Sequence, residues 1–315
     1  DYSLLGYFKQ TFFKKIISRK SKEIISDIIN AKPNILHVHI HPKELNLGII
    51  IEQKIKCKLI YTQHSVHLTP PTLSLNILGI IFRFTYRKYH LIAVSQSALD
   101  EIKQHRLLGI DKTLTLIENK LNLNLFKLKQ KQTKDYISVV YVARIGFPKG
   151  HAELIHAWSK LINEPTKKKL FLVGPDGMNN EIQELVEKIV PNNSVVFLGA
   201  QYNIAAILNE CDFAVFPSFK EGLPLALLEK MAMELPVIVS DIPELTNIVE
   251  DSVNGLVFKS GDVDDLAKKI TFLLQNPEVR LQLGKNAKKT ILDRFGSLNI
   301  ALPNEKVYEK IMKYL

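Results

Sequence analysis

The chain has 315 residues, of which 46% are hydrophobic and 23% are charged. These values exclude a disordered, collagen-like or fibrous protein and are typical of a globular protein of about two domains. Cys57 and Cys211 match no metal-ligand or redox spacing, so we expect reduced thiols in a cytosolic protein. We expect no bilayer-spanning helix, which would need ~18 to 20 apolar residues, and no signal peptide.

The net charge of +10 is unevenly divided. Residues 1–134 hold 22 Lys and Arg against 9 Asp and Glu, a net +13, whereas residues 135–315 hold 20 against 23, a net −3. This favours an anionic partner, an acidic membrane surface or a nucleic acid, although a lysine-rich solvated surface gives the same pattern. Because residues 1–134 carry no nucleic-acid-binding motif with interleaved aromatic residues, we expect no nucleic-acid partner.

Strands alternate with helices in the first part of the chain. Short, β-rich apolar runs predict strands at residues 34–40, 58–64 and 91–95. Helical patterns cover residues 21–33 and 95–105. Either Ser95 or Ser97 is suited to be the N-cap of the second helix. A basic, irregular stretch at residues 125–135 ends this part.

The alternation then restarts with five strands. The strands are predicted at residues 137–144, 169–174, 194–199, 213–218 and 236–241. The helices between them are predicted at residues 150–163, 179–189, 203–209 and 224–233. Such alternation implies a parallel sheet covered by helices on both faces. Two units of this kind predict two Rossmann-like domains, with ligand bound in a cleft at the carboxyl ends of the strands.

Two motifs follow strands of the second part. In "ARIGFPKG", Arg144 and Lys149 are suited to a diphosphate because Arg can clamp two oxygens and Lys adds a compact charge. In "PSFKEGLPLALLEKMA", Glu221 precedes a helix N-terminus, which favours an anion, and Pro224 suits the first turn. Glu229 falls in the second turn, where its carboxylate can accept two hydrogen bonds from a ribose diol.

These motifs, "RIGFPKG" and "PSFKEGLPLALLEKMA", resemble those of the retaining glycosyltransferases of family 4. The family signature is a Glu, seven residues and a second Glu, preceded by an Arg and a Lys-Gly. The segment "SDIPELTNIVEDSVNGLVFKSGDVDDLAKKI" extends the resemblance, and "KPNILHVHIH", "YTQHSVH", "IAVSQSALDEI" and "LIENKLNLNLF" carry it more loosely. The resemblance spans residues 32–295 and implies the GT-B fold, an α/β fold of two doubly wound parallel-sheet domains.

The resemblance also implies the roles of the site residues. The catalytic residues would be Glu221, His64, Arg144 and Lys149. The donor-binding residues would be Arg144, Lys149, Phe197, Leu198, Gly199, Glu221, Gly222, Leu223, Pro224, Leu225 and Glu229. In this assignment Arg144 and Lys149 bind the diphosphate and Glu229 the ribose, Glu221 and segment 222–225 hold the sugar and its phosphate, and the base stacks near segment 197–199. His64 matches a histidine placed near the sugar.

We expect neither a metal nor a cofactor, and a UDP-sugar rather than a GDP-sugar as donor. His37, His39 and His41 alternate along one predicted strand, which a metal site could use. Without a paired carboxylate or cysteine we interpret them as one polar strand face. His67 has no partner in the pattern.

The sequence departs from the family at three places. The strand, Gly-rich loop and helix expected at the acceptor side do not precede Asp1, so we expect about 60 to 90 residues to be missing. Lys120 stands where a glycine is usual, and Glu234 where a small residue is usual. The predicted domains are residues 1–134, incomplete at the start, residues 135–297, and a helix at 298–315 that packs back on the first domain.

The predicted function is retaining, metal-independent hexosyl transfer from a nucleotide sugar to a glycan or polyprenyl-linked acceptor in bacterial surface-polysaccharide synthesis. A sugar-nucleotide-binding module, inactive without a missing segment or partner, stays open; it would bind nucleotide without turnover. A GT-B hydrolase or epimerase gives less reason for the diphosphate-binding pair. A basic nucleic-acid-binding protein would instead bind arbitrary DNA in a salt-sensitive way.

One segment suggests a place in the cell. In "LSLNILGIIFRFTYRKYH", apolar and aromatic residues run into Arg83, Arg87 and Lys88. Such a segment can lie at a membrane interface, and it can equally be a core helix with a basic end. Basic residues near an anionic surface contribute ~1 kcal/mol each. We therefore expect a cytoplasmic protein, peripheral on the inner face of the cytoplasmic membrane.

Overall fold

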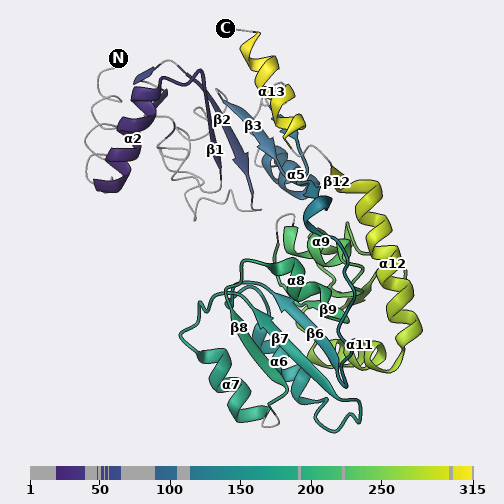
Figure 1. Cartoon of the computed structure of the whole chain (residues 1–315). Helices are drawn as coiled ribbons and strands as arrows, with labels where there is room; N and C mark the ends of the chain where they lie inside the picture. The colour runs from purple at the N-terminus through teal and green to yellow at the C-terminus, as the bar shows by residue number, and fades with distance from the viewer. Residues whose placement is uncertain are drawn as a thin grey trace. The chain divides into compact units, whose positions relative to one another are not determined.

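The structure is a computed structural model in which two compact units are distinguished (Figure 1). It describes residues 19–39, 48, 51–52, 54–55, 57–64, 89–104, 114–190, 193–221, 224–297 and 301–313. Unit 1 is Asp1–Ile117 with Asn304–Leu315, and unit 2 is Glu118–Pro303. The predictions that lie outside the described residues concern Gly222, Leu223, His41, His67, Arg83, Arg87 and Lys88.

Unit 1 is built on a parallel sheet of four strands in the order β1-β2-β3-β4. Its strands are β1 (Ile35–His39), β2 (Lys58–Gln63), β3 (His90–Ala93) and β4 (Leu114–Leu116). Its helices are α2 (Arg19–Ala31), α5 (Gln96–Gln104) and most of α13 (Leu302–Met312). Of the two predicted caps, Ser95 is the one that caps α5, because its Oγ accepts a hydrogen bond from Ala98 N at 3.2 Å.

The helix α13 packs on the sheet of unit 1, although unit 2 lies between them in the sequence. Val307 is buried with Ile60 of β2 and Ile92 of β3. The Tyr308 hydroxyl, one residue further along α13, hydrogen-bonds to His37 Nδ1 of β1 at 2.5 Å. Apolar contact and one polar contact therefore hold the helix on the sheet.

Unit 2 is built on a parallel sheet of six strands in the order β11-β10-β9-β6-β7-β8. Its strands are β6 (Ile137–Val142), β7 (Lys168–Val173), β8 (Val195–Gly199), β9 (Phe213–Phe216), β10 (Val237–Ser240) and β11 (Leu256–Phe258). Its helices are α6 (His151–Ser159), α7 (Glu181–Ile189), α8 (Ile204–Asn209), α9 (Leu225–Ala232), α10 (Pro243–Thr246), α11 (Val263–Gln275) and α12 (Pro277–Arg294). The short elements β5 (Leu121–Asn122), η1 (Leu123–Leu125) and β12 (Gly296–Ser297) complete it, with β5 and β12 paired.

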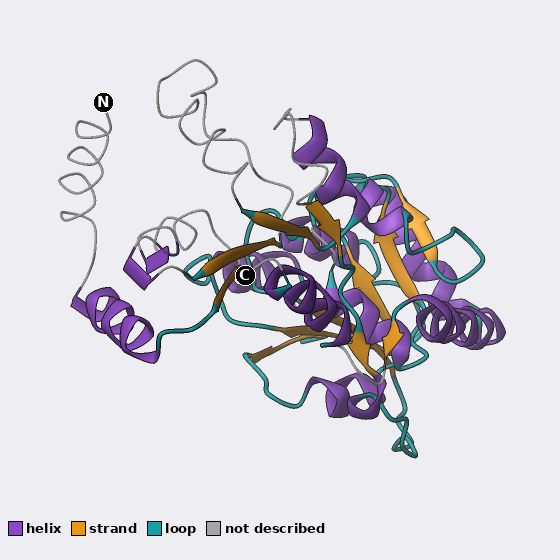
Figure 2. Cartoon of the chain, turned by 90° about the horizontal axis from the view of Figure 1, so that it is seen from above, coloured by secondary structure: helices purple, strands orange, loops and turns teal. Residues whose placement is uncertain are grey.

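The core of unit 2 follows from this order. Strands β6, β9 and β10 are central and carry almost only buried residues, as a parallel sheet covered on both faces requires. Helix α6 contacts α7 and α11, whereas α9 contacts α12. Figure 2, coloured by secondary structure, shows the strands flanked by helices. The predicted α/β class, with two parallel-sheet units, is confirmed.

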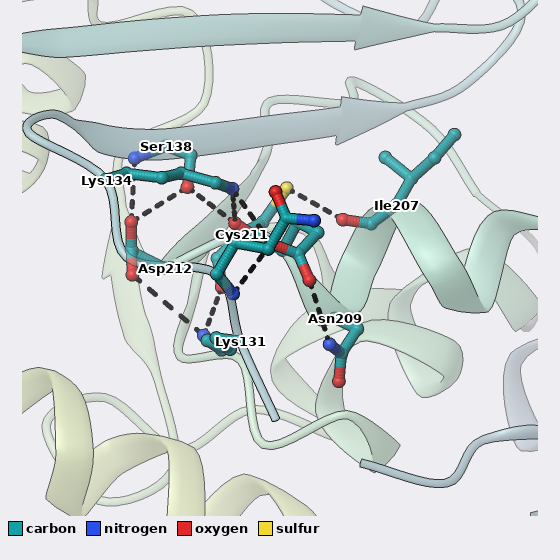
Figure 3. Close-up of polar contacts among 9 residues, drawn as sticks. Lys131, Lys134, Ser138, Ile207, Asn209, Cys211 and Asp212 are labelled. Carbon is teal, nitrogen blue, oxygen red and sulfur yellow. Dashed lines mark hydrogen bonds and ion pairs between the residues drawn. The ribbon is translucent and has the colours of Figure 1, made fainter. Parts of the chain in front are cut away.

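The units divide at Ile117, earlier than the boundary predicted at residue 134. The reason is a polar network that fixes the basic stretch to the start of β9 (Figure 3). Lys131 Nζ donates to the Cys211 carbonyl oxygen at 2.5 Å, and Lys134 Nζ donates to the Glu210 carbonyl oxygen at 2.6 Å. The basic stretch that was predicted to end the first part of the chain therefore belongs to unit 2.

Candidate functional site

The predicted diphosphate-binding residues lie where the strand order of unit 2 reverses. From β6 the chain proceeds to β7 and β8 on one side, and then returns to β9, which pairs with β6 on the other side. Arg144 and Lys149 follow the carboxyl end of β6, and Glu221 follows that of β9. In open parallel sheets, ligands bind at the carboxyl ends of the strands at this switch point.

Two loops meet there, residues 143–150 and 217–221. Phe219 N donates a hydrogen bond to the Pro148 carbonyl oxygen at 2.9 Å. Gly150 has a φ of +71° and lies so close to the second loop that an added Cβ would be 2.0 Å from the Pro217 carbonyl oxygen. A side chain at Gly150 would therefore force the two loops apart.

A buried hydroxyl lies beneath these loops. Tyr141 OH donates to the Lys149 carbonyl oxygen at 2.7 Å and lies 3.2 Å from Ser218 Oγ. Ser240 Oγ, at the end of β10, donates to the Ser218 carbonyl oxygen. Burial raises the pKa of the Tyr141 hydroxyl far above its ordinary value. Tyr141 therefore stays protonated and holds the backbone at Lys149.

The structure brings Lys149 and Glu221 into direct contact. Lys149 Nζ and Glu221 Oε1 are 2.6 Å apart, with 30% and 7% of the respective side chains exposed. A carboxylate buried to this degree needs a cation or donor close by. Lys149 supplies it while keeping part of its ammonium accessible, as a ligand anion would require.

Arg144, unlike Lys149, has no ion-pair partner among the described residues. Its side chain is exposed, and no hydrogen bond or ion pair to it is found in the described part of the chain. The loop after β7 runs beside it, since Ile145 N donates to the Pro175 carbonyl oxygen at 3.0 Å. A Cβ at Gly177 would be 2.8 Å from Arg144 Nε. The guanidinium thus packs against backbone and leaves its donors for a ligand.

The helix α9 provides the next part of the site. Pro224 is its N-cap, just before the first turn predicted for it, and Leu225 is exposed at the first helical position. Glu229 is half-buried in the second turn. Burial raises the pKa of the Glu229 carboxyl above its ordinary value, and Lys230 opposes this shift. No hydrogen bond of this carboxylate to a described residue is found, so its oxygens are available as acceptors.

Sequence reasoning missed Lys230, which is completely buried. The signal was present, because Lys230 lies three residues after the buried Leu227 and therefore on the same side of the helix. It also missed Tyr141, whose hydroxyl is invisible in an apolar strand pattern. Phe197 and Leu198 are half-buried residues of β8, which ends at Gly199. Gly174 N donates to the Gly199 carbonyl oxygen at 2.8 Å.

The predicted His64 lies in unit 1, in a cluster of imidazoles that we call the histidine cluster: His37, His39 and His64. The Nε2 of His64 lies 3.0 Å from His39 Nδ1, and the ring centroids of His37 and His39 are 4.1 Å apart. Burial lowers the pKa of all three imidazoles, and that of His37 falls to about 4. His37 is further held by Thr62 Oγ1 at 2.7 Å from its Nε2. The cluster is neutral at neutral pH.

Two general properties complete the description. Among the residues that the structure describes, no group of three or more His, Cys, Asp or Glu side chains is arranged to hold a metal ion. Within the same described ranges, no helix is both long and apolar enough to cross a bilayer.

The family model of the glycosyl transferases group 1 matches residues 125–290, more than half of the chain. The chain belongs to the group 1 glycosyl transferases. The matched region contains both loops at the switch point, the helix α9 and all the site residues predicted in unit 2.

Three curated relatives are similar to this chain. N-acetyl-alpha-D-glucosaminyl L-malate synthase of Bacillus anthracis is 25% identical over 291 residues, 89% of this chain and 75% of that protein. The capsular polysaccharide biosynthesis glycosyltransferase CapM of Staphylococcus aureus is 27% identical over 71% of this chain and 62% of its own length. N,N'-diacetylbacillosaminyl-diphospho-undecaprenol alpha-1,3-N-acetylgalactosaminyltransferase of Campylobacter jejuni is 31% identical over 56% of this chain and 45% of its own length. The chain thus spans less than two thirds of the last two relatives.

Solved structures give the fold. HepE of Anabaena, in complex with UDP and glucose, matches with a TM-score of 0.76 and 20% identity over 92% of this chain and 82% of that chain. Sucrose-phosphate synthase of Thermosynechococcus elongatus matches with a TM-score of 0.79 and 21% identity over 96% of this chain and 79% of its own. With its two parallel-sheet α/β units, this chain has the predicted GT-B fold.

Proposed function

We propose that this protein is a retaining glycosyltransferase of family 4 that transfers a hexosyl group from a UDP-sugar without a metal ion. The single observation that carries the proposal is the Lys149–Glu221 contact of 2.6 Å at the strand-order reversal of unit 2. In this contact, the cation stands on the loop after β6 that also carries Arg144, and the carboxylate stands on the loop that leads to α9. The UDP bound in the HepE structure supports uracil as the base.

The chemistry follows from where charge develops. Breaking the bond between the sugar and the diphosphate puts negative charge on the departing phosphate oxygen. Arg144 and Lys149 stabilise that charge, together with the free amides at the N-terminus of α9. Because two fixed cations and a helix terminus neutralise the diphosphate, the reaction needs no divalent ion. Glu229 holds the ribose through two accepted hydrogen bonds.

In this proposal, Glu221 has one role before the donor binds and another afterwards. It restrains Lys149 before the donor arrives, and the sugar hydroxyls then become partners of its carboxylate. Segment 222–225 contacts the sugar and its phosphate, and the uracil stacks near segment 197–199. The position predicted for His64, near the transferred sugar, is tested by His64→Ala. We expect that variant to bind donor normally and to lose turnover.

Donor binding is the direct test. Calorimetry with UDP-glucose and GDP-mannose should show binding of the uridine nucleotide by the wild-type chain, and Arg144→Ala and Glu229→Ala should each weaken it. Losing a charge-assisted hydrogen bond removes ~1.5 to 3 kcal/mol, about 10- to 150-fold in affinity. Unchanged binding in both variants, with the fold intact by circular dichroism, would refute the assignment of the donor site.

Stereochemistry and metal dependence are tested separately. The anomeric configuration of the product, read by NMR, should equal that of the donor, and activity should persist in EDTA. An inverted product contradicts retention, and complete loss of activity in EDTA contradicts metal independence.

For the acceptor, we propose a glycan or polyprenyl-linked sugar of bacterial surface-polysaccharide synthesis. The name of the Campylobacter relative describes a polyprenyl-diphosphate-linked sugar, and that of the Staphylococcus relative describes capsule synthesis. The +13 charge of residues 1–134 supports work at the anionic inner face of the cytoplasmic membrane. Sedimentation with anionic vesicles should recover the protein at low salt and release it at high salt. Equal recovery in the supernatant with neutral and anionic vesicles would contradict a membrane-bound location.

A further inference from the structure

Lys230 is a lysine that the fold of unit 2 buries completely. Its Nζ donates one hydrogen bond, to the Ala226 carbonyl oxygen at 2.8 Å, and lies 4.9 Å from the centre of the Phe216 ring. An ammonium has three protons to donate. Within the described residues, the carbonyl and the ring are its only direct partners. The charged form is therefore poorly solvated in this state of the protein.

Four ionisable groups face this ammonium from the elements around it. Glu229 precedes it on α9, and Glu221 stands on the loop after β9; both carboxylates favour the charged form. Cys211, just before β9, acts in the same direction, whereas Lys149 on the loop after β6 opposes it. The three charged neighbours are all residues that the proposed function places at the donor, so Lys230 and the donor share the same electrostatic surroundings.

Without a proton on Lys230, the formal charges of the proposed donor site sum to zero. Arg144 and Lys149 contribute two positive charges, and Glu221 and Glu229 contribute two negative ones. A nucleotide sugar brings two negative charges to this balanced set. A proton on Lys230 would give the site a net positive charge just when the anion arrives.

We propose that Lys230 is an electrostatic positioning residue that takes up a proton when the anionic donor binds. The inference rests on the proposed function, because it assumes that a nucleoside diphosphate occupies the loops at Lys149 and Glu221. Lys230 does not touch the donor. It acts through Glu221 and Glu229, whose carboxylates it screens from the incoming phosphates.

The opposing effects of burial and of the nearby carboxylates on the pKa of Lys230 suit this role. Burial, the largest effect, lowers the pKa of its ammonium to about 7, and Glu229 and Glu221 partly oppose the shift. At slightly alkaline pH most molecules without donor therefore hold a neutral amine. Two phosphate charges nearby favour the ammonium and raise its pKa, so the proton comes from solvent. The histidine cluster does not interfere because the pKa values of its imidazoles are lowered and these groups titrate at more acidic pH.

Calorimetry with UDP-glucose at pH 7.5 tests this, because that nucleotide sugar has no ionisable phosphate near neutral pH. The binding enthalpy should differ between buffers of low and high ionisation enthalpy, in the direction of proton uptake, by about 0.3 to 0.8 proton per site. The affinity should fall as the pH rises from 7 to 9, by at most about tenfold per pH unit.

The variant Lys230→Met replaces the ammonium with an apolar side chain of similar length. We expect it to bind UDP-glucose more weakly at pH 7, with no proton uptake and no pH dependence between 7 and 9. Lys160→Met is the matched control, because Lys160 is a half-exposed lysine paired with Asp264; it should keep the uptake of the wild type. If Lys230→Met does not fold, the pH dependence of the wild-type affinity decides instead.

The outcomes separate the two proposals. Equal binding enthalpies in all buffers, a flat pH profile in the wild type, or continued proton uptake by Lys230→Met overturns the role of Lys230 and leaves the proposed function in place. A wild-type chain that binds no uridine nucleotide at any pH overturns both.

Discussion

The site of unit 2 and the histidine cluster of unit 1 both hold polar side chains that are partly removed from water, and they do so in opposite ways. Lys149 and Glu221 form an ion pair across 2.6 Å. His37, His39 and His64 remain neutral, because burial lowers the pKa of each imidazole. The first arrangement can exchange one ion for another, as an anionic ligand requires. The second can offer neutral donors and acceptors to hydroxyl groups and responds strongly to acid.

The largest expected effect is a loss of donor affinity, and it should distinguish the carboxyl ends of the strands of unit 2 from their amino ends. Lys149→Ala removes a cation beside the proposed diphosphate and should weaken UDP-glucose binding about 10- to 150-fold. The control is Lys167→Ala, since Lys167 pairs with Asp135 at the opposite edge, with 73% and 76% of the side chains exposed. Calorimetry should find its affinity within about twofold of the wild type. Equal losses in both variants would show that only net charge matters.

The next effect concerns stability in the absence of ligand. A double-mutant cycle of Lys149→Ala and Glu221→Ala in urea should give a coupling energy of ~0.5 to 3 kcal/mol, because the single variant Lys149→Ala leaves a buried carboxylate without its partner. The same cycle for Lys167 and Asp135 should give a smaller coupling, since water solvates both groups. A larger coupling in the exposed pair would contradict the view that burial gives the Lys149–Glu221 contact its strength.

Two tyrosine hydroxyls sharpen the comparison between the units. Tyr141→Phe removes the bond that holds the backbone at Lys149 and should weaken donor binding about 2- to 12-fold, from ~0.5 to 1.5 kcal/mol. Tyr308→Phe removes the partner of His37 Nδ1 and should lower the melting temperature without changing donor affinity. If both variants bind UDP-glucose like the wild type, the hydroxyl of Tyr141 does not position the loop.

The smallest expected effect is the change of protein stability with pH that His37 causes. The pKa of His37 is about 4 in the folded protein and 6.5 when unfolded, so the unfolded chain binds the proton first as the pH falls. Stability should therefore decrease between pH 6.5 and 4. His37→Gln should flatten this slope in thermal melts, whereas His156→Gln, at an exposed position, should not. An unchanged slope in His37→Gln would show that the imidazole is not kept neutral.

The sequence predicted the strands β6 to β10 and the helices α6 to α9 of unit 2 to within a few residues, because each buried strand is a continuous apolar run. It predicted Arg144, Lys149 and Glu221 as neighbours because the carboxyl ends of parallel strands share one edge of the sheet. It missed the three-residue strands β4 and β11, and it gave no bounds for the helices α10, α11 and α12. It also placed residues 118–134 outside unit 2, because only the fold shows that Lys131 and Lys134 hydrogen-bond to carbonyl groups before β9. Lys230 was missed because a lysine is ordinarily assigned to the exposed face of a helix, even where its spacing from a buried residue matches the apolar face.

The path of the chain into α13 has a consequence for synthesis. Unit 2 needs only Glu118–Pro303, one uninterrupted stretch. Unit 1 needs Val307 against Ile60 and Ile92, so its core closes around residues made more than two hundred positions apart. During synthesis, the sheet of unit 1 therefore keeps an open face until Val307 has been made.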